Sequence, residues 1–154
     1  MKVDGGLMGQ LEHAGAAGKR LEEMGYDGAV TAETAHDPFF PLLMAAQETQ
    51  RVELITSIAV AFSRTPMNLA NVGHDLNSFS KGRFVLGLGS QIRAHITKRF
   101  SMPWSSPAKR MREFITAMRA IWDSWHKGER LAFEGEFYTH KLMTPMFTPT
   151  DVDY

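Results

Sequence analysis

The segment Gly82-Arg83-Phe84-Val85-Leu86-Gly87-Leu88-Gly89-Ser90-Gln91 decides how the rest of this 154-residue chain is interpreted. A glycine precedes a short apolar run, and the run opens into a loop with two glycines and small polar side chains. This pattern is typical of a buried strand whose C-terminal end leaves bare backbone within reach of a ligand. A binding site at that end needs other strands beside it.

Three earlier segments are strand candidates, namely 2–7, 29–32 and 53–60. Each precedes a helix candidate, and these helices begin near Leu11, Pro41 and Pro66. Strand starts near residues 2, 29, 54 and 84 give a βα unit that recurs every 25–30 residues. Right-handed crossovers make such strands parallel, so their C-terminal ends meet at one edge of the sheet, where ligands of α/β folds bind.

The chain after this series changes character. A short helix is expected over 95–100, and Ser106-Pro107 is a good N-cap and first-turn pair for a long helix. The buried stripe predicted for the third helix consists of Leu69, Val72, Leu76 and Phe79, and that of the long helix includes Phe114, Ile121 and Trp125. A hairpin with arms 130–133 and 136–138 follows, and the tail beyond Pro145 looks irregular.

The composition is that of a globular protein, with 44% hydrophobic residues and a balance of 17 basic against 17 acidic residues. The balanced charge gives no reason to expect a nucleic-acid partner. No stretch approaches the ~20 apolar residues that span a bilayer, so we expect a cytoplasmic protein without a membrane partner. The chain has no cysteine, and its six histidines lack paired metal-ligand spacing, so no metal site is predicted.

Two segments at the predicted sheet edge carry groups suited to chemistry. Glu33 and His36 follow the second strand, where they are either a polar surface loop or groups that hydrogen-bond and transfer protons over the edge. The Gly87–Ile92 loop starts like a dinucleotide fingerprint, but Ile92 occupies the third glycine position. A modest basic cluster nearby is either a solvated face or a contact for a phosphate-bearing cofactor tail; it comprises Arg93, Lys98, Arg99, Lys109 and Arg110.

Five stretches form a recognisable series along the chain. They are GYDG at 25–28, TAETAHDP at 31–38, SKGRFVLGLGS at 80–90, MPW at 102–104 with RMRE at 110–113, and FEGEFY at 133–138. Together they cover nearly the whole chain. With them the chain resembles the bacterial-luciferase-like monooxygenase superfamily, and within it most of all the coenzyme F420-dependent oxidoreductases.

The resemblance implies an α/β fold, a partial (β/α)8 TIM barrel with about four βα units in parallel and a C-terminal hairpin and irregular tail. Residues 1–154 would be a single domain, the N-terminal half of such a barrel. The implied cofactor is F420, or alternatively FMN, at the C-terminal ends of the strands. In relatives a non-prolyl cis peptide in strand three supports the deazaflavin ring, and the matching pair here is Ser57-Ile58. The ends of strands two and four add Glu33, Thr34, Gly89 and Ser90 to the implied cofactor site.

Two departures from the family pattern concern the catalytic groups. Several relatives place a catalytic histidine where this chain has Thr34, which leaves His36 and Glu33 as the candidate catalytic residues. Some F420 enzymes continue the strand-four loop as Gly-x-Gly-Ser/Thr-Gly-Glu, whereas this chain has Gln91-Ile92 in the last two places.

The expected function is therefore an F420- or flavin-dependent oxidoreductase that transfers hydride to or from a small organic substrate. A complete barrel needs about 250 residues, so half a barrel would leave strand edges unpaired and an apolar face uncovered. This predicts association into a homo-oligomer. The alternatives are a truncated, catalytically inactive flavin-binding or assembly module, and an open doubly wound α/β domain, which the missing fingerprint glycine disfavours.

Overall fold

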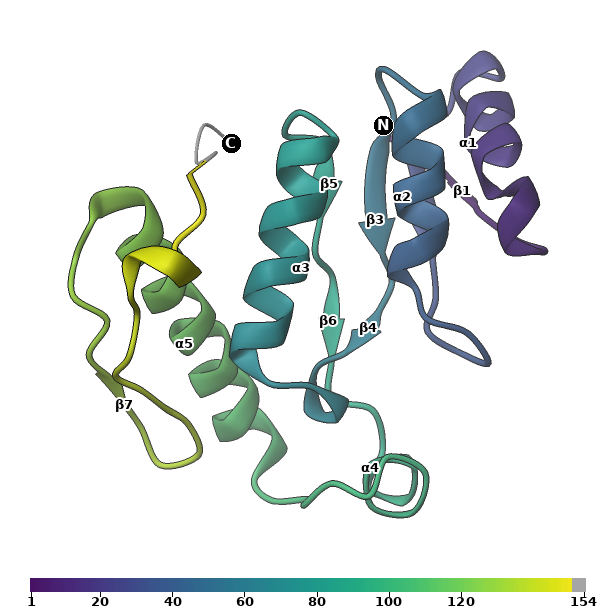
Figure 1. The fold of residues 1–154 in the computed structure, drawn as a ribbon. Coiled ribbons are helices and arrows are strands. Elements are labelled where there is room, and N and C mark those ends of the chain that lie inside the picture. The colour runs from purple at the N-terminus through teal and green to yellow at the C-terminus, as the bar shows by residue number, and fades with distance from the viewer. Residues whose placement is uncertain (151–154) are drawn as a thin grey trace. The chain divides into compact units, whose positions relative to one another are not determined.

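The structure is a computed structural model that describes residues 1–150, and the chain divides into two compact units. Among the described residues, the first unit holds 1–59 and 73–89, and the second holds 60–72 and 90–150. Helix α3 (Pro66–Phe79) contributes to both units. Figure 1 shows the elements of each unit in chain order.

The first unit is built on a parallel four-stranded sheet of order β1-β2-β3-β5. Its strands are β1 (Asp4–Gly6), β2 (Gly28–Thr31), β3 (Glu53–Thr56) and β5 (Phe84–Val85). The connections hold a 3-10 helix, η1 (Leu11–His13), and the helices α1 (Ala14–Glu23) and α2 (Phe39–Glu48). The recurring βα units and the partial-barrel fold class expected from the sequence are thus confirmed.

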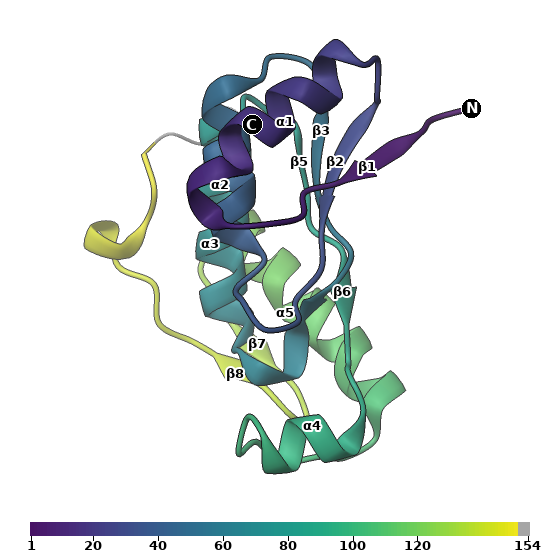
Figure 2. The ribbon, with the colours of Figure 1, turned by 90° about the vertical axis from the view of Figure 1, so that its right-hand side faces the viewer.

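Helices α1 and α2 pack closely because small residues face each other between them. A Cβ placed on Gly18 of α1 would lie 2.7 Å from the Cβ of Ala45 on α2, so only glycine fits there without a shift. Figure 2 shows both helices on the same side of the strands. Ala29, Leu54 and Leu42 are fully buried in the core between the sheet and α2, and Phe84 packs against them.

Arg83, just before β5, fixes the end of α2 at the amino end of the strands. Its guanidinium donates five hydrogen bonds of 2.8–3.1 Å, whose acceptors are the carbonyls of Ala46, Thr49, Val52 and Ser80 and the hydroxyl of Thr49. Ala46 lies in the last turn of α2 and Thr49 is the C-cap residue that follows it, where helix carbonyls lack internal donors. One side chain therefore caps a helix and joins it to two strands.

Glu22 of α1 has the complementary role at the same end of the unit. Its carboxylate accepts hydrogen bonds from the backbone N–H groups of residues 50, 51 and 52, at 2.6–3.1 Å, just before β3 begins. Burial by itself raises the pKa of this carboxyl, but the three donors and the neighbouring Arg51 outweigh it, so the pKa of Glu22 is lowered from its ordinary value of 4.5.

Two strands predicted as continuous are interrupted at the carboxyl end of the sheet. The segment 53–60 forms β3 and then β4 (Ala59–Val60), and the segment 82–91 forms β5 and then β6 (Leu88–Gly89). Strands β4 and β6 pair in a separate two-stranded sheet. The alternation of faces is broken between the two halves of each strand, and hydropathy alone did not reveal that break.

The second unit consists of helices, a hairpin and 3-10 turns. Its elements, besides the first half of α3, are η2 (Ala61–Ser63), α4 (Arg93–Lys98), α5 (Pro107–Lys127), β7 (Phe133–Glu134), β8 (Thr139–His140) and η3 (Pro145–Phe147). The core joins Ile121 and Trp125 of α5 to Ala70 and Leu131. The carboxylate of Glu113 accepts the N–H groups of residues 136–138 at 2.7–3.0 Å and so holds the hairpin on α5.

Several local expectations need correction. Helix α2 begins at Phe39 rather than Pro41, because Asp37 accepts the Phe39 N–H at 2.9 Å. Phe79 is 52% exposed and is not part of the buried stripe of α3. Ser106 occupies the N-cap position of α5 but makes no side-chain cap. The hairpin pairs Phe133 with His140, so its arms lie later in the chain than predicted; residues 151–154 of the predicted irregular tail lie outside the described residues.

We predict that Arg83→Lys lowers the free energy of unfolding by about 2 kcal/mol, because one ammonium cannot serve the five acceptors that the planar guanidinium reaches. The measurement is urea denaturation followed by circular dichroism. Arg20→Lys, an exposed arginine on α1, is the matched control and should leave the midpoint unchanged. Equal midpoints for the two variants would contradict the capping role of Arg83.

The lowered pKa of Glu22 predicts a pH-dependent contribution to stability. A carboxyl whose pKa is depressed in the folded state stabilises the fold above its ordinary pKa of 4.5 and loses this contribution as pH falls through the folded value. The difference in melting temperature between the wild type and Glu22→Gln should therefore be largest at neutral pH and shrink below about pH 4.5. Glu23→Gln, one residue along and exposed, is the control. A difference that stays constant with pH would refute this account.

Candidate functional site at the carboxyl ends of the strands

A hydroxyl bridge between two strands defines the geometry of the carboxyl edge. Thr56, the last residue of β3, donates a hydrogen bond from its hydroxyl to the Gly87 carbonyl and accepts one from the Gly87 N–H, both at 2.9 Å. A Cβ on Gly87 would lie 2.0 Å from the Thr56 carbonyl oxygen. This approach is closer than any side chain allows, so glycine is required at position 87.

The peptide between Ser57 and Ile58 is cis, as the family resemblance implied. It separates β3 from β4, and the backbone on both sides is held by neighbouring strands. Ser57 N–H donates to the Thr31 carbonyl at 2.6 Å, and Ala59 N–H donates to the Gly87 carbonyl at 2.9 Å. The Ile58 carbonyl accepts the Glu33 N–H at 3.2 Å. The ends of β2, β3 and β5 are thereby joined around one bulge.

Gly89 of β6 lets the bulge approach it. A Cβ on Gly89 would lie 2.7 Å from Cδ1 of Ile58, so the isoleucine side chain occupies the space over the glycine backbone. The side chain of Ile58 is half-buried, while Ser57 is exposed. The result is a small apolar wall at the edge of the sheet, next to exposed polar groups.

The structure brings together five of the six residues predicted to bind the cofactor: Glu33, Thr34, Ser57, Ile58 and Gly89. Thr34 is exposed directly after Glu33, which is half-buried. The sixth residue, Ser90, follows Gly89 in the chain and its hydroxyl donates to the Gln91 carbonyl at 3.2 Å. Whether these residues bind a cofactor stays a prediction.

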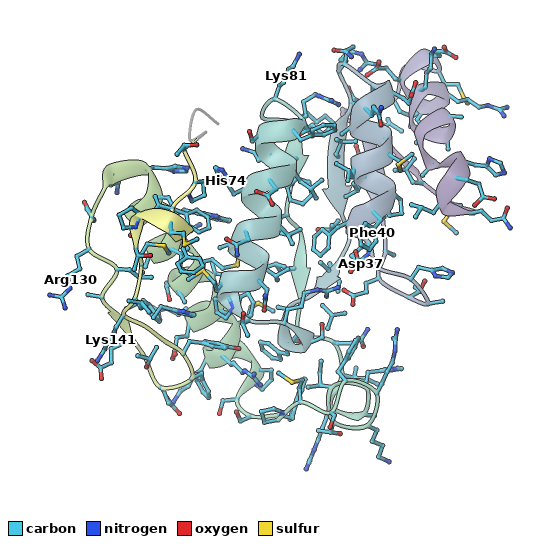
Figure 3. The ribbon with its side chains drawn as sticks, in the orientation of Figure 1. Asp37, Phe40, His74, Lys81, Arg130 and Lys141 are labelled. Carbon is cyan, nitrogen blue, oxygen red and sulfur yellow. The ribbon has the colours of Figure 1, made fainter. Side chains whose placement is uncertain are left out.

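His36, the other catalytic candidate, is exposed three residues beyond Glu33. It lines a cavity of about 550 Å³ formed by the loops that follow β1 and β2. Asp37 and Phe40 line the same cavity and lie together at the start of α2 (Figure 3). Residues 9–12 complete the other wall. His36 therefore faces a surface hollow beside the strand ends.

Sequence reasoning missed the two threonines that organise the strand ends. Thr31 ends β2 and Thr56 ends β3, and both are buried. The Thr31 hydroxyl donates to the Pro38 carbonyl at 2.9 Å and so anchors the loop that carries Glu33 and His36. A signal existed, since each threonine closes an apolar strand at the same place in its βα unit.

One member of the basic cluster considered for a phosphate, Arg110, is not on the surface. Arg110 is buried in the second unit, where it lies 4.6 Å from the centre of the Phe62 ring and donates to the Tyr138 hydroxyl at 2.8 Å and to the Pro103 carbonyl. Its role is structural. Arg93, Lys98, Arg99 and Lys109 are exposed, and Arg99 lies 4.9 Å from the Phe100 ring centre.

Within residues 1–150, no group of three or more His, Asp or Glu side chains is placed to hold a metal ion. None of the helices in that part of the chain is long and apolar enough to cross a membrane.

The donor set at the strand ends fits a planar heterocycle better than a phosphate. Ile58 over Gly89 offers an apolar wall to a ring face, and the hydroxyl of the exposed Ser57 offers a hydrogen bond to its polar rim. The candidate residues include no lysine or arginine, the side chains that usually hold phosphates. The residues present therefore fit the ring part of F420 or FMN and leave the phosphate part to other groups.

With a parallel βα series, a cis bulge in its third strand and a glycine-lined fourth strand, the fold defines a known class. Residues 2–153 match the family model of the luciferase-like monooxygenases, and the chain belongs to this family. It is 62% identical to an uncharacterised protein of Mycobacterium tuberculosis over all 154 residues, which is 45% of that protein. It is also 30% identical to an F420-dependent glucose-6-phosphate dehydrogenase of Rhodococcus hoagii, over 80% of this chain and 40% of that protein.

Solved structures resemble the fold at lower identity. The oxygenating constituent of 3,6-diketocamphane monooxygenase of Pseudomonas putida, in complex with FMN, gives a TM-score of 0.78 at 16% identity over 99% of this chain and 48% of that one. The coenzyme F420-dependent tetrahydromethanopterin reductase of Methanopyrus kandleri gives 0.74 at 18% identity over 91% and 44%. The chain spans less than half the length of these relatives and structures.

Substitution by alanine should cost different amounts of folding stability at Gly87 and Gly89, the two glycines at the carboxyl edge of the strands. Gly87→Ala places a Cβ against backbone that cannot move aside, whereas Gly89→Ala meets the flexible end of Ile58. We expect Gly87→Ala to lower the free energy of unfolding by about 3 kcal/mol and Gly89→Ala by about 1 kcal/mol. Thermal denaturation of both variants beside the wild type measures this. Equal losses would contradict the close approach of Gly87 to Thr56.

Proposed function

We propose that this chain is the cofactor-holding part of an F420-dependent oxidoreductase of the luciferase-like family, with FMN as the alternative cofactor. The observation that carries the proposal is the wall of Ile58 over Gly89 beside the Ser57-Ile58 cis peptide. The comparisons support it in two ways. A relative in sequence is named for F420, and solved structures with this fold include one named for F420 and one in complex with FMN. The whole enzyme would act on a small organic substrate.

Each residue of the proposed site has a part that follows from its place. Ile58 would pack against one face of the ring, and the missing Cβ of Gly89 lets the Ile58 side chain lie over the Gly89 backbone. Thr56 and Gly87 fix the separation of the strands that carry the wall. Glu33 donates its N–H to the Ile58 carbonyl, so its backbone is fixed beside the bulge that would hold the ring. When bound, the cofactor supplies hydride transfer.

The proton-transfer group is proposed to come from the loop after β2. Glu33 and His36 both lie on this loop, which Thr31 anchors through the Pro38 carbonyl. Glu33 is the half-buried member and is joined to the bulge, so it is the better placed of the two. His36 faces the hollow beside residues 9–12 and would reach a substrate that enters from that side.

A second candidate function is binding without turnover, as a truncated flavin-binding or assembly module. It is favoured by the absence of lysine and arginine from the candidate residues, since the cofactor's phosphates would then need groups from elsewhere. Residues 1–154 would then be the N-terminal half of the family barrel, as the sequence predicted.

The proposal predicts that purified chain binds F420, measured by quenching of the deazaflavin fluorescence, with FMN titrated in parallel. Ile58→Ala should weaken binding about tenfold because it removes one face of the ring contact. Ile115→Ala on α5, a half-buried isoleucine of the second unit, is the matched control. If neither cofactor binds at concentrations up to about 1 mM, both the enzyme and the flavin-binding module are lost. Binding without any hydride transfer favours the second candidate.

A further inference from the structure

The hollow beside His36 is a cavity of about 550 Å³ that lies wholly within the first unit. Residues 9–12, which follow β1, form one wall, and the other wall consists of His36, Asp37, Phe40 and Pro41 at the start of α2. Asp37 and Phe40 lie together on this second wall (Figure 3). The volume is in the range of cavities that hold small organic ligands. We refer to this cavity as the loop hollow.

Both walls of the loop hollow are fixed by hydrogen bonds and by the packing of α1 on α2. The Asp37 carboxylate accepts the Phe39 N–H at 2.9 Å, and on the opposite wall the His13 N–H donates to the Gln10 carbonyl at 3.0 Å. Behind the walls, a Cβ on Gly15 of α1 would lie 3.2 Å from a backbone carbonyl oxygen of α2. The loop hollow is therefore formed before any ligand arrives, so binding requires little ordering of the protein.

The loop hollow exposes apolar side chains that the core does not use. Phe39 is buried and meets Phe84 edge to face, with 6.4 Å between the ring centres, so Phe39 anchors the first turn of α2 to the sheet. The next residue, Phe40, is 59% exposed, and Leu11 on the other wall is 47% exposed. Exposed apolar side chains that line a concave surface are typical of binding sites.

The charged groups of the loop hollow are carboxylates. Glu12 lies on one wall and Asp37 on the other, and the residues that line the hollow include neither lysine nor arginine. An anionic ligand would be repelled from both walls, whereas a cation would be attracted to both. The ring of Phe40 adds to this preference, because the face of a phenyl ring attracts cations. The lining therefore suits a ligand that is both apolar and positively charged.

We propose that the loop hollow binds a small organic cation, with the apolar body of the ligand against Leu11 and Phe40 and its ammonium group between Glu12 and Asp37. This binding requires no cofactor. Only the further step, that such an amine is the substrate of the whole enzyme, rests on the proposed function.

The test is a titration of the purified, ¹⁵N-labelled chain, without cofactor, with three probes of similar shape. Benzylamine carries the positive charge, benzyl alcohol is its neutral analogue, and benzoate is an anionic one. Amide shifts in two-dimensional NMR spectra measure both the dissociation constant and the location of each probe. We expect benzylamine to shift the amides of residues 9–12 and 36–40 and to bind about tenfold or more tightly than the other two probes.

Three results would overturn the proposal. Equally tight binding of benzyl alcohol would show that the site does not select for charge. Shifts confined to other residues would place the amine elsewhere. A lack of saturable shifts with benzylamine up to about 20 mM would show that the loop hollow holds no such ligand.

Two variants separate the charge of the loop hollow from its apolar surface. Glu12→Gln should weaken benzylamine binding about fivefold and leave benzyl alcohol unchanged, because it removes one charge and keeps the shape. Phe40→Ala should weaken both probes about fivefold, because it removes the aromatic wall. The matched controls are Glu23→Gln and Phe79→Ala, which change exposed residues of the same unit outside the hollow. Equal binding by each variant and its control would overturn the assignment.

Cofactor binding, measured separately, distinguishes failure of this proposal from failure of the proposed function. Benzylamine binding by a chain that binds neither F420 nor FMN would support the loop hollow and refute the cofactor site. Cofactor binding without benzylamine binding would refute the loop hollow and leave the cofactor site intact.

Discussion

The contact between Thr56 and the bare backbone of Gly87 is the constraint on which the candidate site depends. One hydroxyl satisfies both polar groups of Gly87, and the missing Cβ lets the two strand ends approach. That approach leaves the Gly87 carbonyl within reach of Ala59 N–H and aligns Ile58 with Gly89. Without this approach, the side chain of Ile58 in the bulge would not lie over the backbone of Gly89.

The opposite end of the sheet is organised by charge. Arg83 gathers the carbonyls at the end of α2, and Glu22 gathers the N–H groups that precede β3. These two groups satisfy backbone that would otherwise be unpaired where chain segments turn. Fixed charges thus stabilise the amino end of the strands, while the carboxyl end is held by hydroxyls and backbone. This division matches α/β folds, in which stability and chemistry lie at opposite ends of the strands.

Much of the fold follows from the sequence, because βα periodicity and the glycine-bounded fourth strand are local signals. The cis peptide between Ser57 and Ile58 was predicted from the family resemblance and not from the composition. The break within 53–60 lies at this cis peptide, which the resemblance implied, whereas the break within 84–89 escaped prediction because it is set by the neighbouring strand through Thr56 and Gly87. The burial of Arg110 was missed for a similar reason. An arginine is expected at the surface unless its partners are known, and the partners here are the aromatic rings of Phe62 and Tyr138.

The candidate site borders the face of the sheet that turns away from α2. Leu54 of β3 packs in the core under α2, so Ile55 lies on the opposite face, and the exposed Ser57 follows β3 at the strand end. A ring placed against Ile58 would therefore sit at the border of that face.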